Sequence, residues 1–495
     1  MALAYTLFFM LRYGYQFASG DHEEHLPPIY KLVNPSLYQN DFFMNGYESA
    51  FNIRFFFVQL FYYLQKFIDI EILFFSVWLL CLFSLGFIWQ KIAYIVTENI
   101  TASLLTPFFV LFVFYAFTLG SNHITYNILI GGVIAKVFAS FGIYYFLKRR
   151  FVVSGFLFGF GALFQVLSAL QPFVILALFL IFEFKKSELK NLIIFSSTFC
   201  IVGLFILIPV FGNYFTSVSV QEKRLFEQIL FTFRAPWHYM PSAFTLGSYL
   251  KFLMVLIVVL AGIIKTKTNY KNVVLNFSVV FIVVAIIYSV TIELFNNFSL
   301  AKLQWFKASM WVCAFASVYA SYFFSQLISK INSSFKPKTI VIAALLFAFI
   351  FSFTVFNFSF PSSLRNKIKI GNYIKTDLEI VQQWINNNLA NDALFITFPE
   401  DNSFSCNAKR SLVVSPHAFI HTVNRSIAWY YLYSNIYGVN FNNNSINFRK
   451  NLYINIPDSL KNNVYVLYRL NHDSLINCEK EIIKVQGNLA VAKVY

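Results

Sequence analysis

The chain has 495 residues, of which 58% are hydrophobic and only 12% are charged. A soluble globular domain cannot cover its surface with so few polar side chains, so this composition excludes one. The formal net charge of +16 would suggest nucleic acid for a soluble protein, but the Lys and Arg residues lie largely in short loops between apolar runs, where they set orientation in a membrane. We therefore expect membrane lipid, and no nucleic acid, as a partner.

Apolar runs of about twenty residues recur along the chain, and each can cross a hydrocarbon core of roughly 30 Å. They predict a polytopic α-helical membrane protein with about eleven transmembrane helices. The predicted spans are 2–17, 70–90, 102–119, 124–147, 151–168, 171–184, 191–211, 248–264, 272–291, 305–328 and 338–357. Arg12 interrupts the first run, so a tilted span and a signal-like segment both stay open for residues 1–17.

The run from Phe151 to Phe184 decides the orientation. As one helix its roughly 34 residues would extend about 51 Å, more than a bilayer needs, and Gln171–Pro172 offers a break. The short loops 148–150, 185–190, 265–271 and 330–338 are basic. Two spans here place all four of them on one side, which the positive-inside rule makes cytoplasmic. In a bacterial inner membrane the N-terminus is then cytoplasmic. The loops 18–69, 212–247 and 292–304 and the tail lie on the outer, periplasmic face.

Two domains follow from this reading: a transmembrane domain over 1–357 and a periplasmic α/β domain over 358–495. In the tail, the pattern of residues 377–389 predicts an amphipathic helix. Five short runs predict strands: 393–398, 411–415, 464–470, 481–485 and 489–495. Cys406 and Cys478 would be able to pair in an oxidising compartment, although the sequence leaves their separation open.

A dense acidic cluster follows the first apolar run. Asp21, Glu23 and Glu24 stand between Gly20 and His25, with His22 among them, in a chain with only 22 acidic residues. We predict a catalytic role for the three carboxylates and substrate binding for His22 and His25, with Asp21 first because Gly20 permits a tight exit from the span. Asp21 and Glu24 would be the ligands if a divalent metal ion is used. The alternative is an ordinary solvated loop.

Two basic and aromatic stretches on the same predicted face are further candidate sites. Arg234, Trp237 and His238 are predicted to bind substrate, because a guanidinium suits phosphate and Trp can stack on a sugar. An interfacial aromatic belt with a snorkelling Arg is the alternative. Lys302 and Lys307 are predicted to attract a lipid-linked phosphate, with binding of lipid headgroups as the alternative. Lys136, inside a predicted span, is expected to be structural or to face substrate.

The whole arrangement resembles the GT-C superfamily of membrane glycosyltransferases, and more closely an uncharacterised bacterial branch of GT-C-like integral membrane proteins. The segments that carry the resemblance are GDHEEHLPPIY (20–30), GFGALFQVLSALQP (159–172), FRAPWHYMP (233–241), LQWFK (303–307) and NDALFITFPEDNSF with AKRSLVV (391–414). The family more often has His-His at positions 237–238 and Arg at position 307. The resemblance implies sugar transfer from a polyprenyl-phosphate donor, with the carboxylate at Asp21 activating the acceptor and basic residues holding the phosphate.

Two other functions stay open. One is a catalytically inactive GT-C-like scaffold subunit of a cell-envelope complex, with an envelope protein as partner. A lipid or solute transporter is the third hypothesis, although apart from Lys136 the predicted spans offer little polar path.

Overall fold

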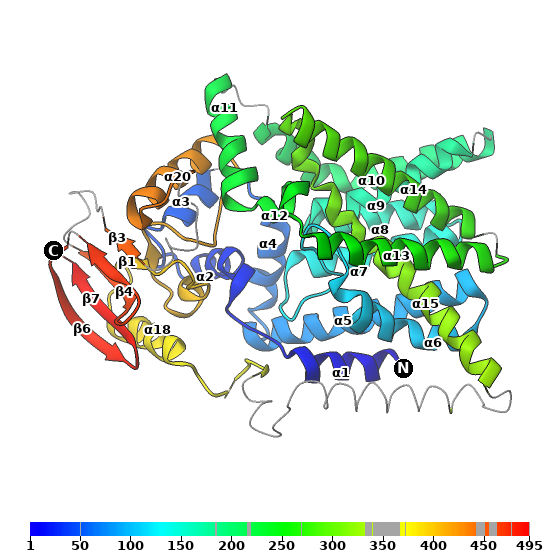
Figure 1. Cartoon of the computed structure of the whole chain (residues 1–495). Coiled ribbons are helices and arrows are strands. Elements are labelled where there is room, and N and C mark those ends of the chain that lie inside the picture. The colour runs from blue at the N-terminus through cyan, green and yellow to red at the C-terminus, as the bar shows by residue number, and fades with distance from the viewer. Residues whose placement is uncertain are drawn as a thin grey trace. The chain divides into compact units, whose positions relative to one another are not determined.

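The structure is a computed structural model that describes residues 1–49, 51–183, 186–214, 219–268, 270–331, 339, 367–371, 373–441, 451–454, 463–476 and 478–494. The predicted span 338–357 thus falls outside the described residues, apart from Thr339. The chain divides into two compact units, each of which is described by itself (Figure 1). Unit 1 comprises Met1–Tyr15, Phe74–Ile208 and Ala235–Lys369, and unit 2 comprises Gln16–Leu73, Pro209–Arg234 and Ile370–Tyr495.

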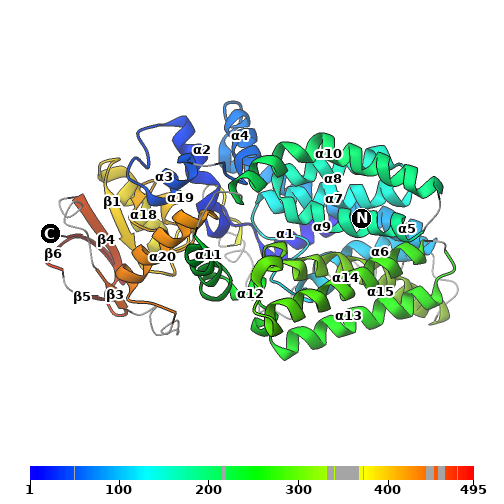
Figure 2. The ribbon, with the colours of Figure 1, turned by 90° about the horizontal axis from the view of Figure 1, so that it is seen from above.

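Unit 1 is a helical bundle. Figure 2 shows its longer helices running roughly alongside one another. Its elements are α1 (Ala2–Tyr13), most of α5 (Ile70–Thr97), α6 (Ile100–Phe108), η2 (Phe109–Val113), η3 (Phe114–Ala116), α7 (Gly131–Leu147), α8 (Phe151–Phe164), α9 (Val166–Phe182), most of α10 (Lys186–Tyr214), α12 (Pro236–Tyr239), η5 (Pro241–Ala243), α13 (Leu246–Lys265), α14 (Lys271–Ser289), η6 (Val290–Leu294), η7 (Phe298–Leu303), η8 (Trp305–Ala308) and α15 (Ser309–Ile331).

Within the described residues, five helices are long and apolar enough to cross a membrane. They are Ile70–Thr97, Lys186–Val210, Leu246–Lys265, Lys271–Leu294 and Leu300–Lys330. Several of them expose large apolar side chains, such as Leu80, Ile208 and Ile257, as lipid-facing helices do. Shorter apolar helices of 10–17 residues account for further predicted spans. The membrane class is thus supported, and the count of about eleven spans stays a prediction.

The predicted break within 151–184 exists, but at another residue. The chain leaves helical conformation at Gln165 (φ −157°, ψ 111°), between α8 and α9. The hydroxyl of Ser168 donates to Oε1 of Gln165. Pro172 instead lies inside α9, where it removes one backbone hydrogen bond. The proline was the wrong marker of the break, since the chain leaves helical conformation earlier, at Gln165.

The span predicted to begin at residue 124 begins at Gly131. Residues 117–130 form a loop in which Gly120 and Ser121 have positive φ of 68° and 52°. The indole of Trp78 donates to Tyr126 O at 2.8 Å, and Ser309 Oγ bonds both the N–H and the C=O of Leu119. These contacts satisfy backbone groups that a helix would otherwise pair.

Unit 2 combines short helices with strands. Its helical elements are η1 (Gly20–Glu24), α2 (Leu26–Val33), α3 (Phe42–Ser49), α4 (Phe55–Leu64), α11 (Val220–Glu227), η4 (Gln228–Arg234), α18 (Asp377–Asn388), α19 (Phe404–Asn407) and α20 (Val423–Tyr437). Its strands are β1 (Leu394–Thr397), β2 (Ser411–Leu412), β3 (Asn451–Tyr453), β4 (Val464–Arg469), β5 (Ser474–Ile476), β6 (Lys480–Gln486) and β7 (Leu489–Val494). The predicted tail helix and all five predicted strands are therefore present.

The larger sheet has the order β2-β1-β4-β7-β6 and is drawn from yellow to red in Figure 1. β1 pairs in parallel with β2 and β4, with Leu394 opposite Val464, and β7 runs antiparallel to β4 and β6. A capping box of Thr376 and Glu379 starts α18, whose Val381 and Ile385 pack on Phe395 and Leu467. The loop around Tyr38 packs on Ala418 and Ile420, which joins residues 16–73 to the C-terminal segment within unit 2.

Candidate functional site

The acidic segment forms a single 3₁₀ turn, η1, that begins at a left-handed glycine. Gly20 has φ 60°, a conformation that favours glycine, and its N–H donates to Asn402 O at 2.8 Å. The first helix already ends at Tyr13 with Gly14 at its C-cap, so Gly20 does not provide the predicted exit from the span. On this turn Asp21 is exposed, while Glu23 is 1% exposed. Of the three predicted catalytic carboxylates, Asp21 thus faces solvent, Glu23 faces the core and Glu24 is half-buried.

Glu23 is enclosed by residues of the C-terminal segment. Its Oε1 accepts a hydrogen bond from the Cys406 N–H at 3.3 Å. Burial, followed by repulsion from the Asp401 carboxylate, raises the pKa of Glu23 to about 8. Burial also raises the pKa of Asp401 to about 6, although its hydrogen bonds with Ser403 and Gln382 act in the opposite direction. Burial and the charge of Asp401 thus both favour the protonated form of Glu23.

Glu24 is held between a backbone amide and a guanidinium. Its Oε1 accepts from the Phe419 N–H at 3.0 Å, and its Oε2 pairs with Arg54 Nη2. Each of these two side chains is only 13% exposed, so this ion pair is screened less than a surface pair. Arg54 was not among the predicted site residues. In the sequence it is one of two charged residues, with Lys66, in the aromatic stretch 51–67.

The charges of Asp21 and Arg234 both act on Arg54. Burial lowers the pKa of Arg54 to about 10, while the negative charge of Asp21 raises it and the positive charge of Arg234 lowers it. Within unit 2, Arg54 thus pairs with Glu24 and responds to the charge of Asp21, which is the exposed carboxylate of the acidic segment.

The guanidinium of Arg234 holds a loop of the C-terminal segment. Nη1 donates to Pro416 O at 3.0 Å and Nη2 donates to His417 O at 2.5 Å. Its Cζ lies 4.5 Å from the ring centroid of Phe419 and 5.1 Å from that of Trp429, both buried. Arg234 thus fixes the loop in which Phe419 binds Glu24. Its predicted contact with phosphate stays a prediction.

Both histidines of the acidic segment are buried. His22 Nδ1 accepts a hydrogen bond from the Ala18 N–H at 3.0 Å. His25 Nδ1 lies 2.6 Å from Asp21 O, and its ring packs edge-on against Phe57 with centroids 4.7 Å apart. Burial lowers the pKa of His25. These contacts shape the turn, and the predicted substrate contacts of His22 and His25 stay untested.

The predicted metal role fits this arrangement poorly. Glu24 already binds Arg54 and the Phe419 N–H, so a divalent ion would have to displace a guanidinium. Among the described residues, no group of three or more His, Cys, Asp or Glu side chains is arranged to hold a metal ion. We therefore derive no step through a metal.

Two other acidic residues of the segment 18–69, Asp41 and Glu48, have structural partners. Asp41 is buried, and its carboxylate accepts from the N–H groups of Met44 at 2.8 Å and Leu412 at 2.7 Å. Burial raises the pKa of Asp41 to about 6. Glu48 forms an ion pair of 2.9 Å with Lys31.

The other predicted site residues belong to unit 1, where the structure brings two of them to one loop. His238 Nδ1 lies 3.0 Å from Gly120 O, and Asn122 Nδ2 donates to Lys307 O at 3.3 Å. A Cβ on Gly120 would lie 3.1 Å from the Lys307 backbone nitrogen, so only glycine allows this approach without adjustment. Trp237 is 48% exposed and Lys302 half-buried. His238 and Lys307 thus converge on residues 120–122.

Lys136 lies beneath the same loop. It is fully buried in α7, donates to His123 O at 2.5 Å and lies 4.4 Å from the ring centroid of Tyr126. His123 stacks on Tyr115, with centroids 4.6 Å apart. The carbonyl and the ring stabilise the buried ammonium, which favours the structural alternative for Lys136.

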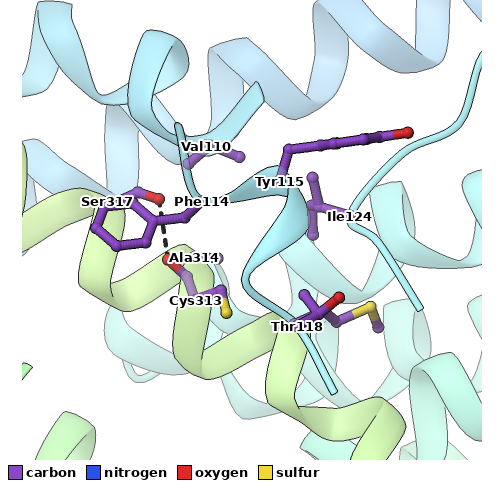
Figure 3. Close-up of a pocket in the computed structure, with 9 residues that line it drawn as sticks. Val110, Phe114, Tyr115, Thr118, Ile124, Cys313, Ala314 and Ser317 are labelled. Atoms are coloured by element: carbon purple, nitrogen blue, oxygen red, sulfur yellow. Dashed lines mark hydrogen bonds between the residues drawn. The ribbon is translucent and has the colours of Figure 1, made fainter. Parts of the chain in front are cut away.

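A small pocket opens beside this loop, between η2–η3 and α15 (Figure 3). Its volume is about 10 Å³, room for about one water molecule. The dashed line in Figure 3 marks the hydrogen bond from Ser317 Oγ to Cys313 O, 2.9 Å long. None of the predicted site residues lines it; the lining residues are Val110, Phe114, Tyr115, Thr118, Ile124, Met310, Cys313, Ala314 and Ser317.

The cysteines are free thiols. Cys406 is buried beside Glu23 and Cys478 is half-buried, and the two do not form a disulfide. The pairing that the sequence left open is therefore absent from this structure.

A scan against protein-family models and a search of curated proteins both return no match. The helices define the class: a mostly helical, membrane-embedded protein with a small C-terminal sheet.

Proposed function

We propose that the protein is a membrane glycosyltransferase that transfers a sugar from a polyprenyl-phosphate donor to an acceptor on the periplasmic face of a bacterial inner membrane. The observation that carries the proposal is the exposed carboxylate of Asp21, whose charge acts on the guanidinium of Arg54. A general base must be reachable by the acceptor, and guanidinium groups suit the charge of a phosphate. The apolar helices of unit 1 support a lipid-linked donor.

In the proposed reaction, an acceptor hydroxyl attacks the anomeric carbon of the sugar through its oxygen. Asp21 takes the proton of that hydroxyl. The bond from that carbon to the phosphate oxygen breaks, and the polyprenyl phosphate leaves with the bonding electron pair. Such a single displacement inverts the anomeric centre. Arg54 is the candidate partner of the phosphate charge within unit 2, while Arg234 orders the loop at Pro416–His417.

The test in cells compares surface glycans of a strain that lacks the gene with those of the complemented strain. We expect the wild-type gene to restore a missing glycan or glycoform, and Asp21→Asn to fail although its amount in the membrane is unchanged. Asp392→Asn, at an exposed acidic residue of the same unit, is the matched control and should restore it fully. Complete restoration by Asp21→Asn would refute the catalytic role of Asp21.

The contacts of Glu23, Glu24 and Arg234 favour one second candidate, a catalytically inactive scaffold subunit of an envelope complex. All three side chains bind other parts of unit 2, as structural residues do. The scaffold hypothesis predicts that a partner protein copurifies in stoichiometric amount and that Asp21→Asn leaves both the complex and the glycans intact.

A further inference from the structure

The turn that carries Asp21 is fastened to the C-terminal segment at two points. At its start, the Gly20 N–H donates to Asn402 O at 2.8 Å. Near its end, the buried carboxyl of Glu23 accepts a hydrogen bond from the Cys406 N–H at 3.3 Å. The placement of Asp21 therefore depends on residues almost 400 positions further along the chain.

The surroundings of Glu23 disfavour its ionised form. Asp401 faces it from the C-terminal segment with a second buried carboxyl group. Tyr38, from the loop after α2, also faces it, and Lys409 acts on the neighbouring thiol of Cys406. Two carboxylates in one buried region repel each other unless one of them holds a proton.

We propose that Glu23 is a positioning residue: as a neutral carboxylic acid it fastens the Asp21 turn to residues 401–406, and its ionisation loosens that attachment. The inference rests on the proposed function only in naming Asp21 as the group that is positioned. Because the attachment is a property of the fold, it can be measured without a substrate.

The direction of the pH dependence follows from linkage. A carboxyl group whose pKa is higher in the folded state stabilises that state fully below its unfolded pKa of 4.5. This stabilisation is lost as the pH rises through the folded pKa of about 8. The turn should therefore be fastened at pH 6 to 7 and loosened above about pH 8.

Hydrogen exchange of the full chain in detergent tests the proposal, read on peptides that cover residues 18–25 and 402–408. At about pH 7 we expect Glu23→Gln, a neutral isostere, to keep the protection of the Gly20 and Cys406 amides against exchange. In Glu23→Ala the protection factors of these two amides should fall about tenfold or more. Between about pH 7 and 9.5, exchange of the wild type, corrected for the intrinsic rate, should rise about tenfold, whereas Glu23→Gln stays flat. Glu48→Gln, at a carboxylate that is 52% exposed, should follow the wild type.

Two results would overturn the inference. The first is that, at neutral pH, the Gly20 and Cys406 amides of Glu23→Gln exchange as fast as those of Glu23→Ala. The second is that the protection of these amides in the wild type does not change between about pH 7 and 9.5. If Glu23→Ala fails to fold, the comparison of wild type with Glu23→Gln across pH still decides. Asp21→Asn should leave the protection unchanged, so a failure of the proposed catalysis would be visible separately from a failure of this attachment.

Discussion

At the scale of single residues, Arg54 and Arg234 show how a site is assembled from distant segments. Arg234 orders the loop at Pro416–His417, Phe419 in that loop binds Glu24, and Glu24 binds Arg54, which lies within electrostatic range of Asp21. The sequence singled out Asp21 and Arg234 by their type and density. It held no sign of Phe419, because a backbone N–H that binds a carboxylate leaves no trace in composition.

Replacement of Arg234 by Gln should destabilise unit 2. The change removes two charge-assisted hydrogen bonds to backbone carbonyls and the contact with the Phe419 and Trp429 rings. We expect a loss of about 2–4 kcal/mol in unfolding free energy, seen as a lower thermal midpoint of the purified protein and faster exchange at the Phe419 amide. Arg224→Gln, at an exposed position on α11, should change neither. An Arg234→Gln protein as stable as that control would show that the guanidinium contacts contribute little.

At the scale of elements, local patterns predicted the tail better than the apolar core. Short apolar runs identified β1, β4 and β7, and helical spacing identified α18. In unit 1 the runs are apolar throughout, so periodicity cannot show where a helix ends. The loop 117–130 depends on hydrogen bonds of Trp78 and Ser309. Such contacts cannot be read from hydropathy.

The capping box of α18 provides a test at this scale. Thr376 Oγ1 accepts from the Glu379 N–H at 3.3 Å, and Glu379 Oε2 accepts from the Thr376 N–H at 2.8 Å. Thr376→Ala should cost about 1 kcal/mol, because α18 covers the core of the sheet through Val381 and Ile385. Thermal unfolding measures this loss of unfolding free energy, with Thr232→Ala as the control. The hydroxyl of Thr232 is exposed, so the stability of that variant should stay within about 0.5 kcal/mol of the wild type. Equal midpoints for the two variants would count against the cap.

At the scale of the whole molecule, the proposed orientation rests on the basic loops and on two spans within 151–184. We expect a cysteine at Asn40 to react with a membrane-impermeant maleimide in intact spheroplasts, and one at Lys148 to react only after lysis. Both positions are exposed, and the five native free cysteines would first be replaced. Labelling of Lys148→Cys from outside would reverse the orientation and place the C-terminal sheet in the cytoplasm.

The central claim, that Asp21 is the base of a sugar transfer from a lipid phosphate, is tested most directly by transfer rates in proteoliposomes. Polyprenyl-phosphate sugars would be supplied as donors and an extract of the strain that lacks the gene as the source of acceptors. The acceptor-dependent release of polyprenyl phosphate would be measured for the wild type, Asp21→Asn and Asp392→Asn. We predict that Asp392→Asn releases polyprenyl phosphate at the wild-type rate. The rate of Asp21→Asn should be lower by about 100-fold or more, because a general base is removed. Release of polyprenyl phosphate by Asp21→Asn at the wild-type rate would contradict the claim.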